Sequence, residues 1–290
     1  MPCPGVGSDR TRGVPPSLTR NMGEEGRAEW PLGVIVPLQD PTPFSPSVPA
    51  GWRPALREIA GAGYRVVELA VTDPNRLDAK AVADALASEG VRLSSLTTGQ
   101  AAAAEGLSLS TADDAVRERA VERIQAHMRL AARFGAVVIV GLLRGTEGNV
   151  DRLVESLREC ARGAAPVPLA LEPLNRYESR LVNTVDEALD IIDRVGAENL
   201  GLLFDTFHAN IEERDTADAI RAAGERLFHV HLADSNRWPP GHGHFDFSPL
   251  WETLEEIGYR GSLVLECFPR PDRAALLAAG DRVRAGWGTR

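Results

Sequence analysis

Four residues that can bind a metal ion or transfer a proton stand at or near the carboxyl ends of four successive strand-like segments: Glu172, Asp205, His231 and Glu266. Side chains alternate between the two faces of a strand, and this alternation directs all four to the same face. Three carboxylates and an imidazole at an apolar mouth repel one another unless a cation holds them together. An oxygen-rich set with one nitrogen suits Mn²⁺, Mg²⁺ or Co²⁺ better than a structural zinc ion. Such an octahedral ion would keep two positions open for neighbouring oxygens of an α-hydroxyketone.

The elements that must position these residues alternate along the chain from Trp30 onward. Eight apolar runs are typical of strands: residues 31–36, 64–71, 91–98, 136–143, 168–172, 200–205, 227–233 and 262–267. Helix-like segments lie between them, the clearest at 113–134, where Val121, Ile124 and Met128 recur at helical spacing. Eight β/α units predict an α/β fold with a single (β/α)8 TIM barrel, whose active site lies at the carboxyl ends of the strands. An open doubly wound sheet is the alternative, but no glycine-rich phosphate loop follows any run.

Strand alternation also predicts the direction of other side chains. His229 shares the inward face with His231 but lies one layer deeper, as support for the metal site or as a buried core histidine. Glu68 ends the second strand and points inward, so we expect it to contact substrate or to pair with a cation such as Arg237. The opposite face is predicted to pack under the helices: Leu169, Leu171, Leu202, Phe204, Phe228, Val230, Leu263 and Leu265.

Two glutamates of the set suit proton transfer. Glu172 and Glu266 belong to strands three apart in a barrel of eight, so they approach its mouth from nearly opposite sides. Inverting a carbon beside a ketone removes a proton from one face and returns it to the other, which calls for a proton-transfer group on each face. Each glutamate can bind metal with one oxygen and move a proton with the other.

Composition restricts the class of protein and its partners. The 290 residues, 43% hydrophobic and 25% charged, are typical of a globular protein with a sizeable core. The net charge of −9 disfavours general nucleic-acid binding. No run approaches the ~18 apolar residues of a membrane-spanning helix. The scattered Cys3, Cys160 and Cys267 lack metal-type spacing and suit a reducing cytoplasm.

Residues 1–29 differ from the rest of the chain, being rich in Gly, Pro, Ser and Arg. They lack the apolar stretch of ~7–15 residues that a secretory signal needs, and they offer little apolar surface to bury. We therefore predict a disordered extension at 1–29, or a true start at Met22. One catalytic barrel domain at 30–290 follows.

Four segments resemble the xylose isomerase-like barrel superfamily: LEPLNRYE (171–178), FDTFHANIEE (204–213), HVHLADSNRWPPGHGHFDF (229–247) and LVLECFP (263–269). They are most similar to its ketose 3-epimerase branch, the D-tagatose and D-psicose 3-epimerases, and LTTGQAAAAEGLSLS (96–110) resembles the 5-keto-L-gluconate epimerases. The resemblance implies a set of metal ligands: Glu172, Asp205, His231 and Glu266. It also implies that the two glutamates form the acid/base pair and that Glu178, His208 and Arg237 contact substrate.

The resemblance implies an isomerase, a metal-dependent C3 epimerase of a ketose or of a keto-sugar acid of the 5-keto-L-gluconate or D-tagaturonate type. It would work by two-base proton transfer through a metal-stabilised enediolate. One divalent metal ion is expected, Mn²⁺ first and Mg²⁺ or Co²⁺ otherwise. The expected partner is a small sugar or sugar acid, without nucleic acid or membrane, and the protein is expected to be a homo-oligomer. Arg237, Arg144 and Gln100 are candidates for sensing a substrate carboxylate.

Other activities use the same barrel. Aldose–ketose isomerisation and dehydration of a keto-inositol need the same metal site and stay open. A non-catalytic sugar-binding barrel is less favoured because all four ligands are present. An endonuclease IV-like nuclease is also less favoured, since the second and third strands carry Glu68 and no histidine.

Overall fold

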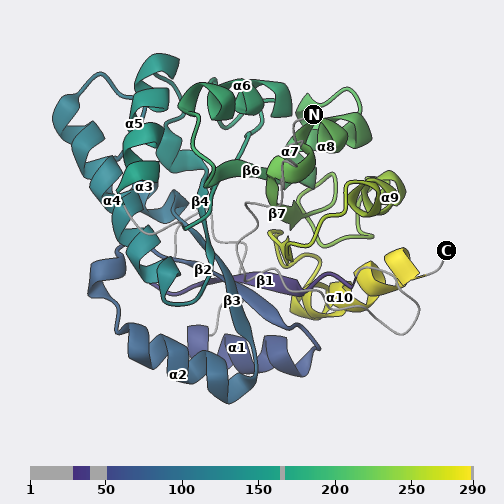
Figure 1. Cartoon of the computed structure of the whole chain (residues 1–290). Coiled ribbons are helices and arrows are strands. Elements are labelled where there is room, and N and C mark those ends of the chain that lie inside the picture. Colours follow the sequence, from purple (N-terminus) through teal and green to yellow (C-terminus); the bar gives the residue numbers. More distant parts are fainter. Residues whose placement is uncertain (1–28, 40–50, 164–166, 289–290) are drawn as a thin grey trace, which may run out of the picture.

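The computed structural model describes residues 29–39, 51–163 and 167–288. Eight parallel strands close into a barrel in chain order and helices surround them (Figure 1). The strands are β1 Leu32–Pro37, β2 Val66–Ala70, β3 Arg92–Thr97, β4 Val137–Val140, β5 Leu169–Leu171, β6 Leu200–Asp205, β7 Leu227–Leu232 and β8 Leu263–Leu265. The predicted (β/α)8 barrel is confirmed. The extension predicted at 1–29 lies, except for Glu29, outside the described residues.

Helical structure follows every strand. The α-helices are α1 Trp52–Gly61, α2 Ala79–Glu89, α3 Gly99–Glu105, α4 Asp114–Ala132, α5 Val150–Arg162, α6 Val185–Val195, α7 Thr206–Glu212, α8 Thr216–Ala223, α9 Ser248–Glu256 and α10 Arg273–Gly288. Short 3₁₀ turns are η1 Pro74–Arg76, η2 Leu142–Arg144 and η3 Gly224–Arg226. Side-chain caps begin several helices, as where Thr184 and Glu187 form a capping box at α6.

The short strands β5 and β8 bring two glutamates to the mouth of the barrel. Each strand ends one residue before its glutamate, so Glu172 and Glu266 are the first residues beyond the strands. Their backbone N–H groups still donate to neighbouring strands, Glu172 to Val140 O at 3.1 Å and Glu266 to Leu232 O at 3.2 Å. These bonds fix where both side chains leave the backbone.

The barrel wall separates two apolar regions. The large core between strands and helices contains seven of the eight residues predicted to face outward: Leu169, Leu171, Leu202, Phe204, Val230, Leu263 and Leu265. Inside the barrel lie two small clusters, one of Ile139, Ala170 and Leu203 and one of Ile35, Ala70 and Val264. The interior is therefore filled by side chains below the mouth.

The eighth residue, Phe228, packs against the interior cluster instead of the helices, so its predicted direction is wrong. The pairing of β6 with β7 shifts between Leu202, which pairs with Leu227, and Leu203, which pairs with His229. Phe228 is the extra residue of this bulge, and a bulge redirects a side chain. Gly201 leaves room for the ring, because a Cβ there would lie 2.6 Å from it.

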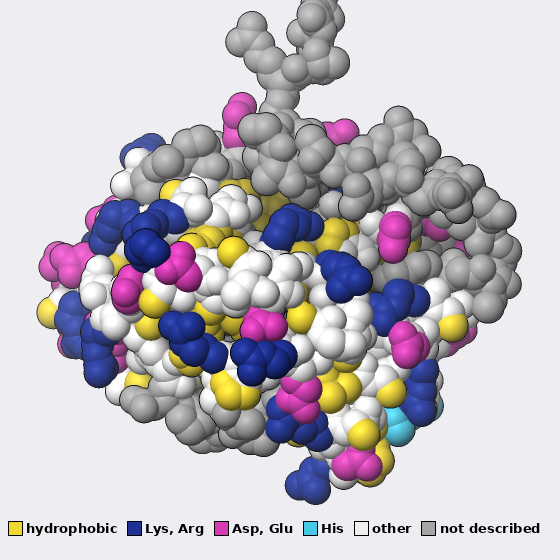
Figure 2. All heavy atoms as spheres, turned by 90° about the horizontal axis from the view of Figure 1, so that it is seen from below, with side chains coloured by type: hydrophobic (Ala, Val, Ile, Leu, Met, Phe, Trp, Pro, Cys, Tyr) yellow, Lys and Arg dark blue, Asp and Glu magenta, His cyan; other side chains and the backbone are white. Residues whose placement is uncertain are grey.

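On the face drawn in Figure 2, the described residues show charges of both signs interspersed, with apolar side chains between them. Among the helices that the structure describes, none combines the length and the apolarity needed to span a bilayer. Large exposed apolar side chains in the described ranges are Tyr177, at 83% exposure, and Phe268, at 41%.

Candidate metal centre

Glu172, Asp205, His231 and Glu266 meet at the mouth of the barrel, as their places at the strand ends predicted. One ligand-type atom from each lies within 4.8 Å of all the others. Nδ1 of His231 is 3.6 Å from Glu172 Oε1, 3.7 Å from Asp205 Oδ2 and 3.3 Å from Glu266 Oε2. All four side chains are buried. We call these four residues the ligand cluster.

Three polar atoms of the ligand cluster have no hydrogen-bond partner: Glu172 Oε1, Asp205 Oδ2 and His231 Nδ1. A buried polar atom without a partner is costly, and here three such atoms face one another. A shared cation would satisfy them all. The donor set of three carboxylates and one imidazole fits Mn²⁺, Mg²⁺ or Co²⁺, so the ligand cluster is able to bind a divalent metal ion.

Asp205 divides its two oxygens between the fold and the site. Oδ1 accepts hydrogen bonds from the backbone N–H groups of Phe207 at 2.7 Å and His208 at 3.3 Å, and so caps α7. Oδ2 is left facing the ligand cluster. The helix start therefore holds this carboxylate in a fixed orientation.

Glu68 lies beneath the ligand cluster rather than in the pocket. It is completely buried and does not line the pocket above the cluster. Its Oε2 lies 3.1 Å from His231 Nε2 and 3.2 Å from His229 Nε2. The sequence predicted that Glu68 contacts substrate or pairs with a cation such as Arg237. β2 continues to Ala70, so Glu68 stands one layer below the strand end, and its partners are His229 and His231 rather than Arg237.

Charges in the ligand cluster change the proton affinity of its members. Burial lowers the pKa of His231, but Glu68 and Glu266 outweigh burial and raise it well above 6.5. Burial raises the pKa of Glu172 to about 7, and Glu266 contributes. Burial opposes ionisation of Glu266 too, yet His231 and Arg237 lower its pKa below the ordinary value. With no cation bound, Glu172 therefore holds a proton more readily than Glu266.

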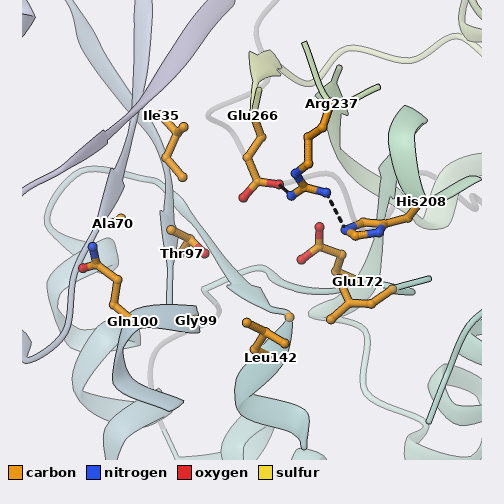
Figure 3. A pocket seen from close by; sticks show the side chains of 12 residues that line it. Ile35, Ala70, Thr97, Gly99, Gln100, Leu142, Glu172, His208, Arg237 and Glu266 are labelled. Carbon is orange, nitrogen blue, oxygen red and sulfur yellow. Dashed lines mark hydrogen bonds and ion pairs between the residues drawn. The ribbon is translucent and has the colours of Figure 1, made fainter. Parts of the chain in front are cut away.

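Arg237 closes one side of the site (Figure 3). Its Nη2 donates to Glu266 Oε2 at 2.7 Å, its Nη1 lies 3.2 Å from His208 Nε2, and its guanidinium lies 4.7 Å from the ring centre of Phe207. Arg237 has a φ of 59°, a conformation that costs energy for a residue with a Cβ. Backbone hydrogen bonds to Asp234 and from Phe268 hold it there.

His208 and Glu178 lie beside Arg237. Burial lowers the pKa of His208 to about 3. Asp205 opposes this shift and Arg237 adds to it, so the ring is neutral at pH 7. Glu178 Oε1 is 4.0 Å from Arg237 Nη1 and accepts from Asn175 Nδ2 at 3.0 Å. His208 and Arg237 line the pocket, whereas Glu178 lies behind Arg237 and does not.

The pocket above the ligand cluster has one polar and one largely apolar side (Figure 3). Glu172, Glu266, His208 and Arg237 lie across from Ile35, Ala70 and Thr97. Leu142 and Leu174 also line the pocket, and the sequence reasoning selected none of these five apolar or small residues. Most of these lie at the ends of strands or in the turns that follow, which is the signal that could have identified them. Gln100 also lines the pocket, and its role in sensing substrate stays a prediction.

Arg144, another candidate for sensing a substrate carboxylate, does not reach the pocket. It is fully buried, and its guanidinium donates to the carbonyl oxygens of Gly141 at 3.2 Å, Leu181 at 2.6 and 3.1 Å, and Val182 at 2.8 Å. Arg144 therefore ties the loop after β5 to the turn after β4.

Gly141 brings the backbone after β4 against the Glu172 carboxylate. A Cβ at this position would overlap Glu172 Oε2. We expect Gly141→Ala to displace the carboxylate and to lower kcat/KM by about 10²-fold, the usual cost of a ~1 Å misplacement. Steady-state kinetics and a thermal melt would measure this. Gly61→Ala at the end of α1 is the matched control, since a Cβ there meets no atom within 4 Å; equal kinetics for both variants would contradict the prediction.

Asp234 organises the loop between β7 and α9. Its carboxylate accepts four backbone N–H hydrogen bonds of 2.8–3.1 Å, from Ser235, Gly241, His242 and Phe245. Burial opposes ionisation, but these bonds lower the pKa of Asp234 below its ordinary 3.8. The ionised carboxylate therefore stabilises the loop that carries Arg237.

Asp234→Asn should reduce the free energy of unfolding by about 1–3 kcal/mol, because the amide NH₂ faces two N–H donors. A carboxylate whose pKa is lowered by folding stabilises the protein above its unfolded pKa, and this stabilisation disappears as the pH falls through the folded pKa. Urea unfolding at pH 7 and pH 3 should thus show a difference from wild type that narrows at pH 3. The exposed Asp246, which accepts from Ser248 N alone, provides the control Asp246→Asn. A difference independent of pH would refute this role.

The closed parallel barrel and the buried ligand cluster at its mouth define a (β/α)8 protein able to bind a divalent metal ion. A sequence profile of the xylose isomerase-like TIM barrels matches residues 56–283. The chain therefore belongs to the xylose isomerase-like TIM barrel family, as its motifs indicated.

Known relatives of the chain include sugar epimerases. It is 44% identical over 124 residues to the D-psicose 3-epimerase of Enterocloster bolteae, a match that covers 42% of this chain and only 41% of that protein. It is 33% identical over 224 residues to the L-ribulose 3-epimerase of Mesorhizobium japonicum, covering 73% and 74% of the two chains. The crystal structure of D-allulose 3-epimerase from Methylomonas sp. in complex with D-allulose matches with a TM-score of 0.71 and 29% identity, over 84% of this chain and 85% of that one.

Proposed function

We propose that this protein is a carbohydrate epimerase that uses one divalent metal ion to invert C3 of a ketose. The observation that carries the proposal is the meeting of two glutamates with Asp205 and His231 at one buried point, because this arrangement combines a metal site with two proton-transfer groups. The 3-epimerases among its relatives support the same activity.

Glu172 and Glu266 would carry the proton. They extend from β5 and β8 and both line the pocket (Figure 3). The two would serve opposite faces of C3, one removing the C3 proton and the other returning a proton to the opposite face. The two exchange roles in the reverse direction. A divalent cation held by the ligand cluster would act as a Lewis acid toward the negative charge that develops on substrate oxygens.

His208 and Arg237 would hold the substrate. Both line the pocket, and the neutral His208 ring and the charged guanidinium can hydrogen-bond to hydroxyl groups. Glu178 lies behind Arg237, so we assign it to orienting that side chain together with Asn175.

A neutral ketose suits the pocket better than a keto-sugar acid. Arg237 is the one cationic side chain among the described residues that line the pocket, and it already donates to Glu266. Arg144 is engaged by backbone carbonyl groups. A substrate carboxylate would therefore be buried beside Glu172 and Glu266 without a cation of its own, which is unfavourable.

Mn²⁺ is the metal we propose, with Mg²⁺ and Co²⁺ as alternatives, because three of the four donors are carboxylates. A cytoplasmic location and a homo-oligomeric state stay predictions from the sequence and its resemblance to known families.

Proton NMR in D₂O tests the proposed reaction. Protein stripped of metal and reloaded with Mn²⁺ or Co²⁺ would be incubated with ketohexoses, ketopentoses and 5-keto-sugar acids, and the ion removed before each spectrum. We expect metal-dependent loss of the C3 proton signal and formation of the C3 epimer, fastest with neutral ketoses. Exchange at C1 without C3 would indicate an aldose–ketose isomerase instead. No exchange with any sugar of the panel would overturn the proposal.

A further inference from the structure

A buried polar network connects the floor of the site to the ligand cluster. It contains Glu68 of β2, Ser95 of β3 and His229 of β7, all at most 1% exposed. Ser95 Oγ donates to Glu68 Oε2 at 2.5 Å, and His229 Nε2 lies 3.2 Å from both Ser95 Oγ and Glu68 Oε2. The proposed proton transfer uses none of these side chains. A fully buried carboxylate is costly to maintain, so its contacts call for an explanation.

The two ring nitrogens of His231 have different neighbours. Nδ1 faces the carboxylates of the ligand cluster, and Nε2 lies 3.1 Å from Glu68 Oε2. A carboxylate accepts hydrogen bonds, so the nitrogen beside Glu68 is the one that keeps its proton. The lone pair of Nδ1 is then available to a cation, because a neutral imidazole carries one proton.

The network also fixes the position of the Glu68 carboxylate. Donors from β3 and β7 converge on the single oxygen Oε2, and the register shift between Val67 and Glu68 sets Glu68 opposite Ser95. The rings of His229 and His231 meet edge to face, with centres 5.2 Å apart. Contacts from two strands thus hold the acceptor of the His231 N–H.

We propose that Glu68, held by Ser95 and His229, is a positioning residue that fixes the tautomer and the orientation of His231 and so raises the affinity of the ligand cluster for its metal ion. This inference rests on the metal site of the proposed function, though not on the identity of the sugar. Carboxylates behind metal-binding histidines generally act in this way.

Calorimetric titration of metal-stripped protein with Mn²⁺ tests the role of Glu68. Glu68→Gln keeps the shape but loses the charge, and Glu68→Asp keeps the charge but withdraws it by one methylene. If orientation matters, both variants should bind Mn²⁺ about 10- to 100-fold more weakly than wild type. Ser95→Ala removes one donor to Glu68 and should weaken Mn²⁺ binding less than the Glu68 variants do. Circular dichroism of the metal-stripped proteins would show whether the Glu68 variants fold. If they do not, Ser95→Ala takes their place in the test.

The tautomer has its own readout in the unsubstituted protein. In ¹⁵N-labelled protein loaded with Mg²⁺, the His231 resonances should show the proton on Nε2 and none on Nδ1. A proton on Nδ1 would overturn the proposal whatever the affinities of the variants.

Other outcomes separate this inference from its competitors. Wild-type affinity in both Glu68 variants would overturn it and leave the epimerase proposal intact. If Glu68→Asp alone bound Mn²⁺ with wild-type affinity, the negative charge of Glu68 would suffice, and its proposed role in orienting His231 would be overturned. Two Mn²⁺ ions per chain would instead indicate a second site built from Glu68, His229 and His231, which also offer three ligand-type atoms close together. No binding by wild type would contradict both the inference and the metal-dependent function.

Discussion

Glu266→Gln is expected to give a folded protein that binds metal but epimerises its ketose about 10²–10⁴-fold more slowly, the usual contribution of a general base. The amide keeps the shape of the side chain and an oxygen that can face the cation and Arg237, yet it cannot accept a proton. Formation of the C3 epimer followed by proton NMR gives the rate, and Mn²⁺ titration shows whether the ligand cluster survives.

Isotope exchange distinguishes a two-base mechanism from simple damage. If Glu172 and Glu266 serve opposite faces of C3, Glu266→Gln should still exchange the C3 proton of one epimer with D₂O, and Glu172→Gln that of the other. Neither variant should interconvert the epimers at a significant rate. A fully active Glu266→Gln would exclude Glu266 as a base, and loss of exchange with both epimers in both variants would contradict the division of faces.

Removing the metal is expected to have an effect at least as large. Chelation should reduce epimerisation to background, and Mn²⁺ should restore it, because the charge that develops on the substrate then lacks a Lewis acid. Mn²⁺ at a hundredfold excess over its Kd should also add about 2.7 kcal/mol to the free energy of unfolding, visible as a higher Tm. Activity that survives exhaustive chelation would refute the proposed role of the ligand cluster.

The pH dependence of metal binding follows from the same geometry. Protons on Glu172, whose pKa is about 7 with no cation bound, and on His231, whose pKa is raised, compete with the metal. Affinity for Mn²⁺ should therefore fall as the pH is lowered from 8 to 6, since binding releases protons. Asp205→Asn removes one ligand charge from the cluster. Its affinity for Mn²⁺ at constant pH shows how much binding weakens when a ligand is lost for a reason other than protonation.

Much of the fold and of the ligand cluster could be predicted from the chain alone. Alternation of apolar strands and amphipathic helices is a local property, and eight such units leave few ways to bury their apolar faces. Once the barrel is assumed, a polar residue at a strand end must face the mouth, and this reasoning selects Glu172, Asp205, His231 and Glu266. That these four side chains lie together could be predicted without knowing the conformation of any loop.

Only the tertiary structure decided what the remaining polar side chains do. Glu68 lies against His231 rather than facing the pocket because of its depth along β2, and Arg144 binds backbone carbonyl groups of a loop 37 residues away in sequence. Phe228 turns inward because it is the extra residue of a bulge in β7, where that strand pairs with β6. In each case the partner comes from a distant segment, and the register and depth that bring the two together are set by the closing of the barrel. The hydrophobic periodicity of a single strand does not predict this register or this depth.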